Sequence, residues 1–219
     1  MDNETDFKIT NFYYEEAPNS NAPFEIPRFN GFLAEKKFLS KEESSLLYKS
    51  FLEKEVLIKK EISQNLESKF SNFILNGYRF YDYFSLFNDS DSKKLNTRIQ
   101  NELKILAKIF DFKLKEESMH SWLNILRKGE YVPKHCHILE NKPSLSYVIF
   151  LNDSETTFNL EIPHFYKTSK EGELNHFPEY LVRPNMGQMI AFPSWMFHST
   201  KFHTEEDKRV SLAGTIKLF

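Results

Sequence analysis

Three of the seven histidines are spaced so that they could bind one metal ion. His135 and His137 are separated by one residue in the segment YVPKHCH, and His198 follows about 60 residues later. Because alternate residues of a strand point to the same face, a strand over this segment would direct both imidazoles to one side. Three ligands on one side of a metal leave its other coordination positions open. The alternative is a surface strand with two exposed histidines.

The C-terminal segment RVSLAGTIKLF adds a candidate anion-binding residue. Strand alternation places Arg209, Ser211 and Ala213 on one face of the predicted strand. An arginine that points into a β-barrel is costly unless it meets an anion. Its planar fork suits a carboxylate, which a neighbouring hydroxyl can share. The alternative is an ion pair between Arg209 and a local acid such as Asp207.

These residues lie in a second half that is dominated by predicted strands. Short apolar or alternating runs are bounded by turn sequences such as KGE, NDS and NMG. The predicted strands are SWLNIL, YVPKHCH, SLSYVIFL, TFNLEI, EYLVR, GQMIAF and KRVSLAGTIKLF. Short strands without intervening helices predict a jelly-roll (double-stranded β-helix) or a barrel, covered on one side by helices.

The first half carries helical patterns. In SKEESSLLYKSFLEK, Ser40 and Glu43 have the spacing of a capping box, and Leu46, Leu47 and Phe51 are expected on one helix face. A second helix is predicted from DSDSKK onward by apolar residues at steps of three and four. These residues are Leu95, Ile99, Leu103, Leu106, Ile109 and Phe110.

The expected organisation is one domain of the α+β class, mainly β. Residues 1–25 are polar and are expected to form an extended arm that is available to a protein partner. Residues 26–118 are expected to give helical support, with strands in FEIPRFNGFL and NFILNGYRFYDYFSLF, and residues 119–219 the jelly-roll core. A chain of 219 residues suits one well-buried domain rather than two.

Composition excludes several classes of function. The formal net charge is −2, with both signs scattered along the chain, so no basic surface for nucleic acid is expected. The longest apolar runs are about as short as YVIFL, which excludes a membrane span. Cys136 is the only cysteine, so no intramolecular disulfide forms and a reducing, cytoplasmic environment is expected.

Taken together, the motifs resemble those of the 2-oxoglutarate/iron(II) oxygenases of bacteria and tailed phages, relatives of the prolyl 4-hydroxylases. The resemblance rests on W-x-N, a K-G-E turn, H-x-H, L-S, G-Q-M-I-A-F-P-S-W-x-x-H and R-V-S-L, in that order. It covers Trp122 to about Leu212, and the segment F-P-S-W-x-x-H is its most specific part. It implies a dioxygenase that hydroxylates a C–H bond of an unidentified protein or small-molecule substrate. A phage origin would allow a virion-associated protein.

The resemblance also implies roles for single residues. His135 and His198 would occupy the two histidine ligand positions for iron(II). Arg209, helped by Ser211, would bind the distal carboxylate of 2-oxoglutarate, and Asn124 would hydrogen-bond this co-substrate. Three aromatic residues are further candidates for the wall of the pocket: Trp122, Tyr131 and Tyr147.

The third ligand position departs from the family pattern. Most members have an acid there, whereas this chain has His137, with Glu140 as the nearest acid downstream. Imidazole in place of carboxylate leaves the site one unit more positive and alters its redox behaviour. Two other interpretations therefore stay open. One is a non-catalytic jelly-roll that serves as a binding or structural module, for example in a virion. The other is a three-histidine enzyme of the cupin type that needs no 2-oxoglutarate.

Overall fold

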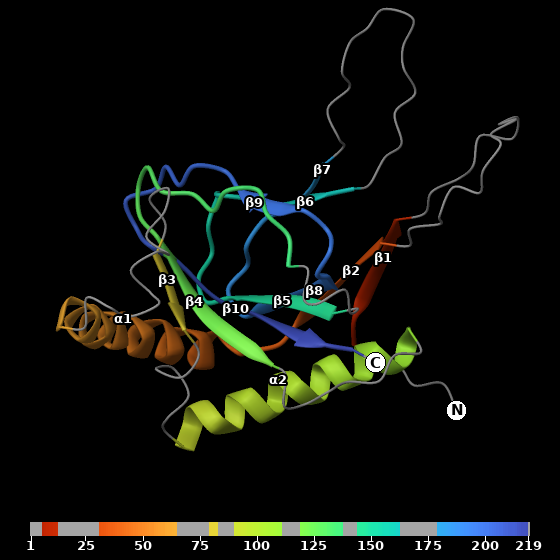
Figure 1. Ribbon diagram of the computed structural model, residues 1–219, viewed down its shortest axis with the longest axis horizontal. Coiled ribbons are helices and arrows are strands. Elements are labelled where there is room, and N and C mark those ends of the chain that lie inside the picture. The colour runs from red at the N-terminus through yellow and green to blue at the C-terminus, as the bar shows by residue number, and fades with distance from the viewer. Residues whose placement is uncertain are drawn as a thin grey trace, which may run out of the picture.

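Two facing antiparallel sheets and two helices make up the computed structural model, which describes residues 6–12, 31–64, 79–82, 90–110, 119–137, 144–162 and 179–218 (Figure 1). The helices are α1 (Lys41–Gln64) and α2 (Ser90–Ile109). The strands are β1 (Lys8–Phe12), β2 (Gly31–Lys37), β3 (Arg79–Asp82), β4 (His120–Leu126), β5 (Ser144–Phe150), β6 (Phe158–Glu161), β7 (Glu179–Val182), β8 (Gln188–Pro193), β9 (His198–Thr200) and β10 (Arg209–Lys217). In this part of the chain, neither helix is apolar over a length that would cross a membrane.

The large sheet has the strand order β1-β2-β8-β5-β10-β4-β3, and the small sheet has the order β7-β6-β9. Strand β10 lies between β4 and β5, with Ser211 opposite both Asn124 and Phe150. Figure 1 shows the helices on one face of the large sheet and the small sheet over the other face. Apolar side chains between two facing sheets are the arrangement of a jelly-roll, so the predicted mainly-β fold class is confirmed.

The two faces of the large sheet bury separate hydrophobic cores. On the helix face, Phe51 of α1 and Leu103 of α2 belong to one cluster with Leu123 and Leu212 of the sheet. Between the sheets, a second cluster is rich in phenylalanine and includes Phe150, Phe158 and Phe192. The alternation of Val210 and Leu212 with Ala213 assigns successive β10 side chains to these two cores.

Helix α1 begins with the predicted capping box. The Ser40 N–H donates to the Glu43 carboxylate at 2.8 Å, and the Glu43 N–H donates to the Ser40 hydroxyl at 3.1 Å. Phe51 is fully buried, but Leu46 is 70% exposed, so its predicted place on the buried face is wrong. Adjacent residues lie about 100° apart around a helix, and Leu47, four residues before Phe51, takes the position that packs on the core.

Two other expectations differ from the structure. Residues 131–137 do not form a strand; only His135 pairs, through an isolated bridge to His198. Pro133 lacks an N–H donor, so the segment cannot make a continuous ladder. Strand β1 lies in the segment expected to form an extended arm, whereas β2 and β3 overlap the strands expected in FEIPRFNGFL and NFILNGYRFYDYFSLF. In the second helix, Leu95, Ile99, Leu103 and Leu106 are buried as predicted, whereas Ile109 is 41% exposed.

Candidate metal and co-substrate site

His135, His137 and His198, here called the His triad, lie together between the two sheets. One potential ligand atom of each lies within 4.8 Å of those of the other two, and the ring centroids are 4.3–5.2 Å apart. His135 and His198 exchange backbone hydrogen bonds of 3.0 and 2.8 Å, and the His137 N–H donates to the Ser194 carbonyl at 2.8 Å. The backbone therefore aligns the two segments that carry the triad.

Hydrogen bonds orient two of the rings. Nδ1 of His135 lies 2.8 Å from the Pro133 carbonyl, and Nδ1 of His198 lies 3.0 Å from the Met196 carbonyl. Because a carbonyl only accepts, each Nδ1 carries the proton and each Nε2 keeps its lone pair. Metal-binding histidines in proteins commonly have this outer hydrogen bond. Phe158 and Phe192 pack against the buried His198 ring, with centroid distances of 5.6 and 5.0 Å.

Burial keeps the His triad neutral. Desolvation, together with the charge of His135, lowers the pKa of His137 to about 4. Desolvation also lowers the pKa of His135, and it lowers the pKa of the almost fully buried His198 well below its ordinary value. Metal binding requires deprotonated imidazole, so these shifts leave the rings available as ligands at neutral pH.

The donor set fits a divalent transition metal. Three neutral imidazole nitrogens are ligands that suit iron, nickel, copper or zinc, and they leave other positions open. Within the described residues, the cluster of metal-binding side chains holds these three histidines and no carboxylate. The predicted alternative ligand, Glu140, lies outside the described residues. The Cys136 thiol is partly buried, which raises its pKa.

Arg209 lies in the same cavity and has hydrogen-bond donors without partners. Its side chain is 3% exposed, and its Nε and Nη1 atoms are buried without a hydrogen bond. Burial lowers the pKa of Arg209 to about 10, and the charge of Glu205 opposes this fall, so the group is a cation at neutral pH. Among the described residues no ion pair joins Arg209 to Asp207. A carboxylate in this cavity would satisfy the free donors.

Two further candidates lie beside Arg209 and the triad. Ser211 and Asn124 face the cavity from adjacent strands at the same register position. The Asn124 Oδ1 atom is buried without a hydrogen-bond partner. The Trp122 ring lies 5.1 Å from the His137 ring. Among the sequence-predicted residues, Trp122, Asn124, Ser211 and Arg209 thus share one cavity with the triad.

The two tyrosines are placed differently. The Tyr147 side chain belongs to the core on the helix face, because it lies opposite Gly214 rather than Ala213, and its hydroxyl pairs with Ser121. Tyr131 is absent from the cavity lining and packs against Phe202, with ring centroids 4.5 Å apart. Tyr147 nevertheless also borders the cavity, together with its neighbours Ser146 and Val148.

Some lining residues were missed in the sequence. Phe158, Phe192 and Thr200 line the cavity. Thr200 lies two residues after His198, so alternation along β9 would have assigned it to the same face. The Val132 N–H donates to its hydroxyl at 2.8 Å, which gives a second contact between residues 131–137 and β9.

Comparison with known proteins shows which family the cavity-bearing part is similar to. Residues 120–214 match the family described as "Putative 2OG-Fe(II) oxygenase", where 2OG is 2-oxoglutarate. No functionally curated protein matches the sequence at a significant level. The matched range contains the His triad and Arg209, and also the other cavity residues named above: Trp122, Asn124, Phe158, Phe192, Thr200 and Ser211.

Several solved structures share the fold. A prolyl 4-hydroxylase from Pseudomonas putida aligns with a TM-score of 0.57 at 12% identity, over 84% of this chain and 92% of that one. AviO1 from Streptomyces viridochromogenes gives 0.53 at 13% identity, over 84% and 89%. HygX from Streptomyces hygroscopicus, solved with nickel and 2-oxoglutarate bound, gives 0.53 at 12% identity, over 84% and 82%. At these identities the likeness concerns the fold.

Proposed function

We propose that this chain, a 2OG-Fe(II) oxygenase by the match of residues 120–214, binds iron(II) through the His triad and hydroxylates a C–H bond of a second substrate. The dioxygenases of this family use iron(II), 2-oxoglutarate and dioxygen. When bound, the metal and co-substrate supply the oxidising chemistry that turns 2-oxoglutarate and dioxygen into succinate and CO2 while one oxygen atom enters a C–H bond. We further propose a cytoplasmic protein, or a virion-associated one if a phage encodes it.

The observation that carries this proposal is the buried guanidinium of Arg209 beside the three histidines, with two nitrogens that lack a hydrogen-bond partner. A cation without a partner is costly in a core, so its presence indicates a ligand with a carboxylate. Arg209 would bind the distal carboxylate of 2-oxoglutarate, and the Ser211 hydroxyl would share it. Asn124 would offer its side-chain amide to the co-substrate from the neighbouring strand.

The surrounding residues would hold these groups in place and limit water. The His135 and His198 rings are fixed by carbonyls that accept from Nδ1, so their Nε2 lone pairs would face the metal. Phe158, Phe192 and Trp122 give the cavity apolar walls, which strengthen electrostatic contacts inside it. The residues would therefore bind and orient the co-substrate.

Binding of 2-oxoglutarate tests the anchor. Metal-free protein is loaded with iron(II) without oxygen and titrated with 2-oxoglutarate, and the weak visible charge-transfer band of the ternary complex is followed. Arg209→Leu should weaken binding more than tenfold, because a buried charge-assisted pair contributes several kcal/mol. Arg183→Leu is the matched control, since Arg183 is exposed and pairs with Glu155. Equal affinity in wild type and Arg209→Leu would contradict the assigned role.

His137 favours a second candidate, a jelly-roll that binds metal and co-substrate without turnover. Three neutral ligands leave the metal its full charge, which favours the 2-oxoglutarate dianion, but a carboxylate ligand assists the later oxidising steps. We expect tight 2-oxoglutarate binding with slow succinate release when the true substrate is missing. His137→Asp should raise succinate release. If both forms bind iron and 2-oxoglutarate yet release no succinate under oxygen, the non-catalytic function is the better one.

The residues of the same cavity favour a 2-oxoglutarate-dependent oxygenase over a three-histidine enzyme of the cupin type. Such an enzyme has no use for a buried carboxylate anchor, whereas Arg209 and Ser211 offer one beside the triad.

Iron(II) binding that survives His198→Ala would contradict the metal site itself. A calorimetric titration with iron(II) measures this directly, with the exposed His120→Ala as the control.

A further inference from the structure

The pairing between β5 and β10 ends beside Arg209, and one side chain continues it. The last register pair is Phe150 with Ser211, after which the Leu151 N–H donates to the Val210 carbonyl at 3.0 Å. The backbone then leaves the sheet at Asn152. The Asn152 side-chain amide takes over: its Oδ1 accepts from the Val210 N–H at 2.9 Å, and its Nδ2 donates to the Lys208 carbonyl at 3.0 Å.

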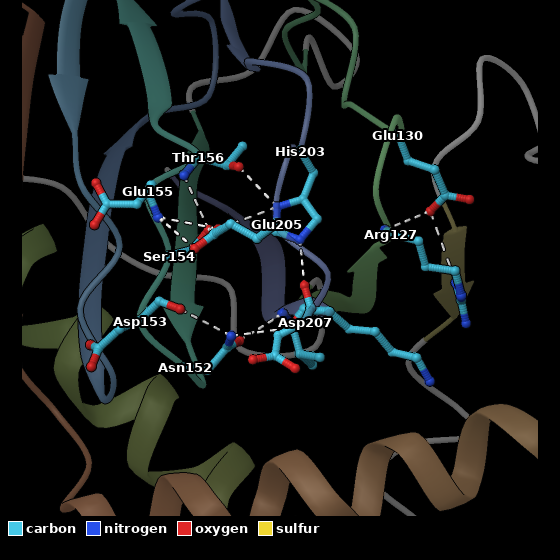
Figure 2. A network of polar contacts seen from close by, with 12 residues as sticks. Arg127, Glu130, Asn152, Asp153, Ser154, Glu155, Thr156, His203, Glu205 and Asp207 are labelled. Carbon is cyan, nitrogen blue, oxygen red and sulfur yellow. Dashed lines mark hydrogen bonds and ion pairs between the residues drawn. The ribbon is translucent and has the colours of Figure 1, made fainter.

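The orientation of this amide follows from its partners. A backbone N–H only donates and a carbonyl only accepts, so the Asn152 oxygen must face Val210 and its nitrogen must face Lys208. The same nitrogen also lies 3.1 Å from the Asp153 carbonyl. Figure 2 shows Asn152 at the centre of these contacts. The two backbone groups that it holds, the Lys208 carbonyl and the Val210 N–H, lie immediately before and immediately after Arg209.

The chain that leads into Arg209 is also fixed. His203 is 1% exposed; its Nε2 donates to the Asp207 carbonyl at 2.5 Å, and its Nδ1 lies 2.8 Å from the Thr156 hydroxyl (Figure 2). Glu205 accepts from the Ser154 hydroxyl. These contacts join residues 152–156 to residues 203–208. On the other side of β10, Arg209 lies opposite Leu126 of β4.

We infer that Asn152 is a positioning residue for the co-substrate: it fixes the backbone of Arg209 and thereby aims the guanidinium at the distal carboxylate. This inference rests on the proposed role of Arg209. The guanidinium carbon lies 5.4 Å from the Phe150 ring centroid, so the side chain extends over the same strand end that Asn152 closes. Without Asn152, the Val210 N–H loses its partner and the Lys208 carbonyl keeps only the long contact with the Tyr48 hydroxyl at 3.5 Å, so the start of β10 is held less firmly on the β5 side. Outer hydrogen bonds that orient metal ligands change metal affinity or activity by about 10–100-fold, and we expect an effect at the lower end of this range for the orientation of Arg209.

Two ligands separate a positioning role from a structural one. 2-Oxoglutarate and 2-oxopentanoate share five carbons and the metal-binding 2-oxo acid end, but the second has a methyl group where the first has the distal carboxylate. Binding of each is measured by calorimetry with nickel(II)-loaded protein, which avoids turnover. The variants are Asn152→Ala and Asn152→Asp; the second keeps the side-chain shape and the acceptor for Val210 but places an oxygen against the Lys208 carbonyl. Asn185→Ala is the control, because the exposed Asn185 also donates to a backbone carbonyl, that of Arg183.

We expect both Asn152 variants to bind 2-oxoglutarate about tenfold more weakly and 2-oxopentanoate within a factor of two of wild type. Asn185→Ala should bind both like wild type. In the Arg209→Leu background, Asn152→Ala should have no further effect on 2-oxoglutarate. Unchanged 2-oxoglutarate affinity in Asn152→Ala and Asn152→Asp, or an equal loss for both ligands, would overturn the inference. If Arg209→Leu itself binds 2-oxoglutarate normally, the proposed anchor fails, and the role of Asn152 fails with it for that separate reason.

Discussion

Replacement of Arg209 by methionine should stabilise the metal-free protein while removing its response to 2-oxoglutarate. Methionine keeps an unbranched, apolar side chain in the cavity and removes the charge. The fall in the pKa of Arg209 to about 10 corresponds to a burial cost of about 3 kcal/mol at 1.4 kcal/mol per pKa unit. The two guanidinium nitrogens without partners are part of this same cost, because they give up water without gaining a hydrogen bond.

Favourable contacts reduce this gain. Glu205 attracts the guanidinium, and the face of the Phe150 ring contributes about 0.5–1 kcal/mol. We therefore expect Arg209→Met to raise the free energy of unfolding by about 1–3 kcal/mol, which is a rise in melting temperature of about 2–10 °C for a chain of this size. Arg183→Met, which breaks an exposed ion pair, should change the free energy of unfolding by less than about 0.5 kcal/mol.

Thermal unfolding with and without ligand measures both effects. Metal-loaded wild type with 2-oxoglutarate at 100 times its Kd should gain about 2.7 kcal/mol, whereas Arg209→Met at the same concentration should gain far less. The difference in the free energy of unfolding between Arg209→Met and wild type should therefore shrink or change sign when 2-oxoglutarate is added. A metal-free Arg209→Met that is less stable than wild type would refute the reasoning, because the guanidinium would then be satisfied within the protein.

Three other outcomes follow from the geometry. The metal-free protein should lose stability as the pH falls from about 6.5 towards 4, because the unfolded chain protonates the His triad before the folded chain does. Each histidine adds up to about 1.4 kcal/mol per pH unit to the slope of the free energy of unfolding against pH. Replacement of the triad by glutamine should remove this contribution. Gly214→Ala should destabilise the protein by about 1–3 kcal/mol or more in urea unfolding, because its Cβ would lie 2.5 Å from the His120 carbonyl oxygen, whereas at Gly31 the added Cβ meets only the flexible end of Met196 at 3.2 Å. Ser40→Ala should cost about 1 kcal/mol through the loss of the α1 cap, and an unchanged urea midpoint would contradict this.

The strand positions of the second half could be predicted because their sequence periodicity matches their burial. The alternation in RVSLAGTIKLF assigned Arg209 and Ser211 to one face, and both line the cavity. The His135 and His137 rings also lie on one side, although residues 131–137 are not a strand. The sequence shows spacing, but it does not show that Pro133 interrupts the ladder and leaves His135 as the one paired residue.

The role of Asn152 was beyond sequence reasoning for a different reason. Its segment, NDS, has the composition of a turn, and its two partners, Lys208 and Val210, lie 56 and 58 residues later. No periodicity links such distant positions, since the contact depends on where β5 ends relative to β10. Leu46 illustrates a smaller failure: a run of neighbouring leucines does not determine which of them faces the core.

The two faces of the large sheet have different tolerances to substitution. The helices pack on one face, and the cavity with the triad and Arg209 opens on the other, so β10 contributes Val210 and Leu212 to the first and Arg209 and Ser211 to the second. Amino-acid replacements in α1 or α2 can therefore accumulate as small losses in melting temperature without moving a ligand atom. Variation on the cavity face, in contrast, changes what the protein binds while the helix-side core continues to support folding. A lineage could acquire a new substrate on one face of this sheet and retain its fold on the other.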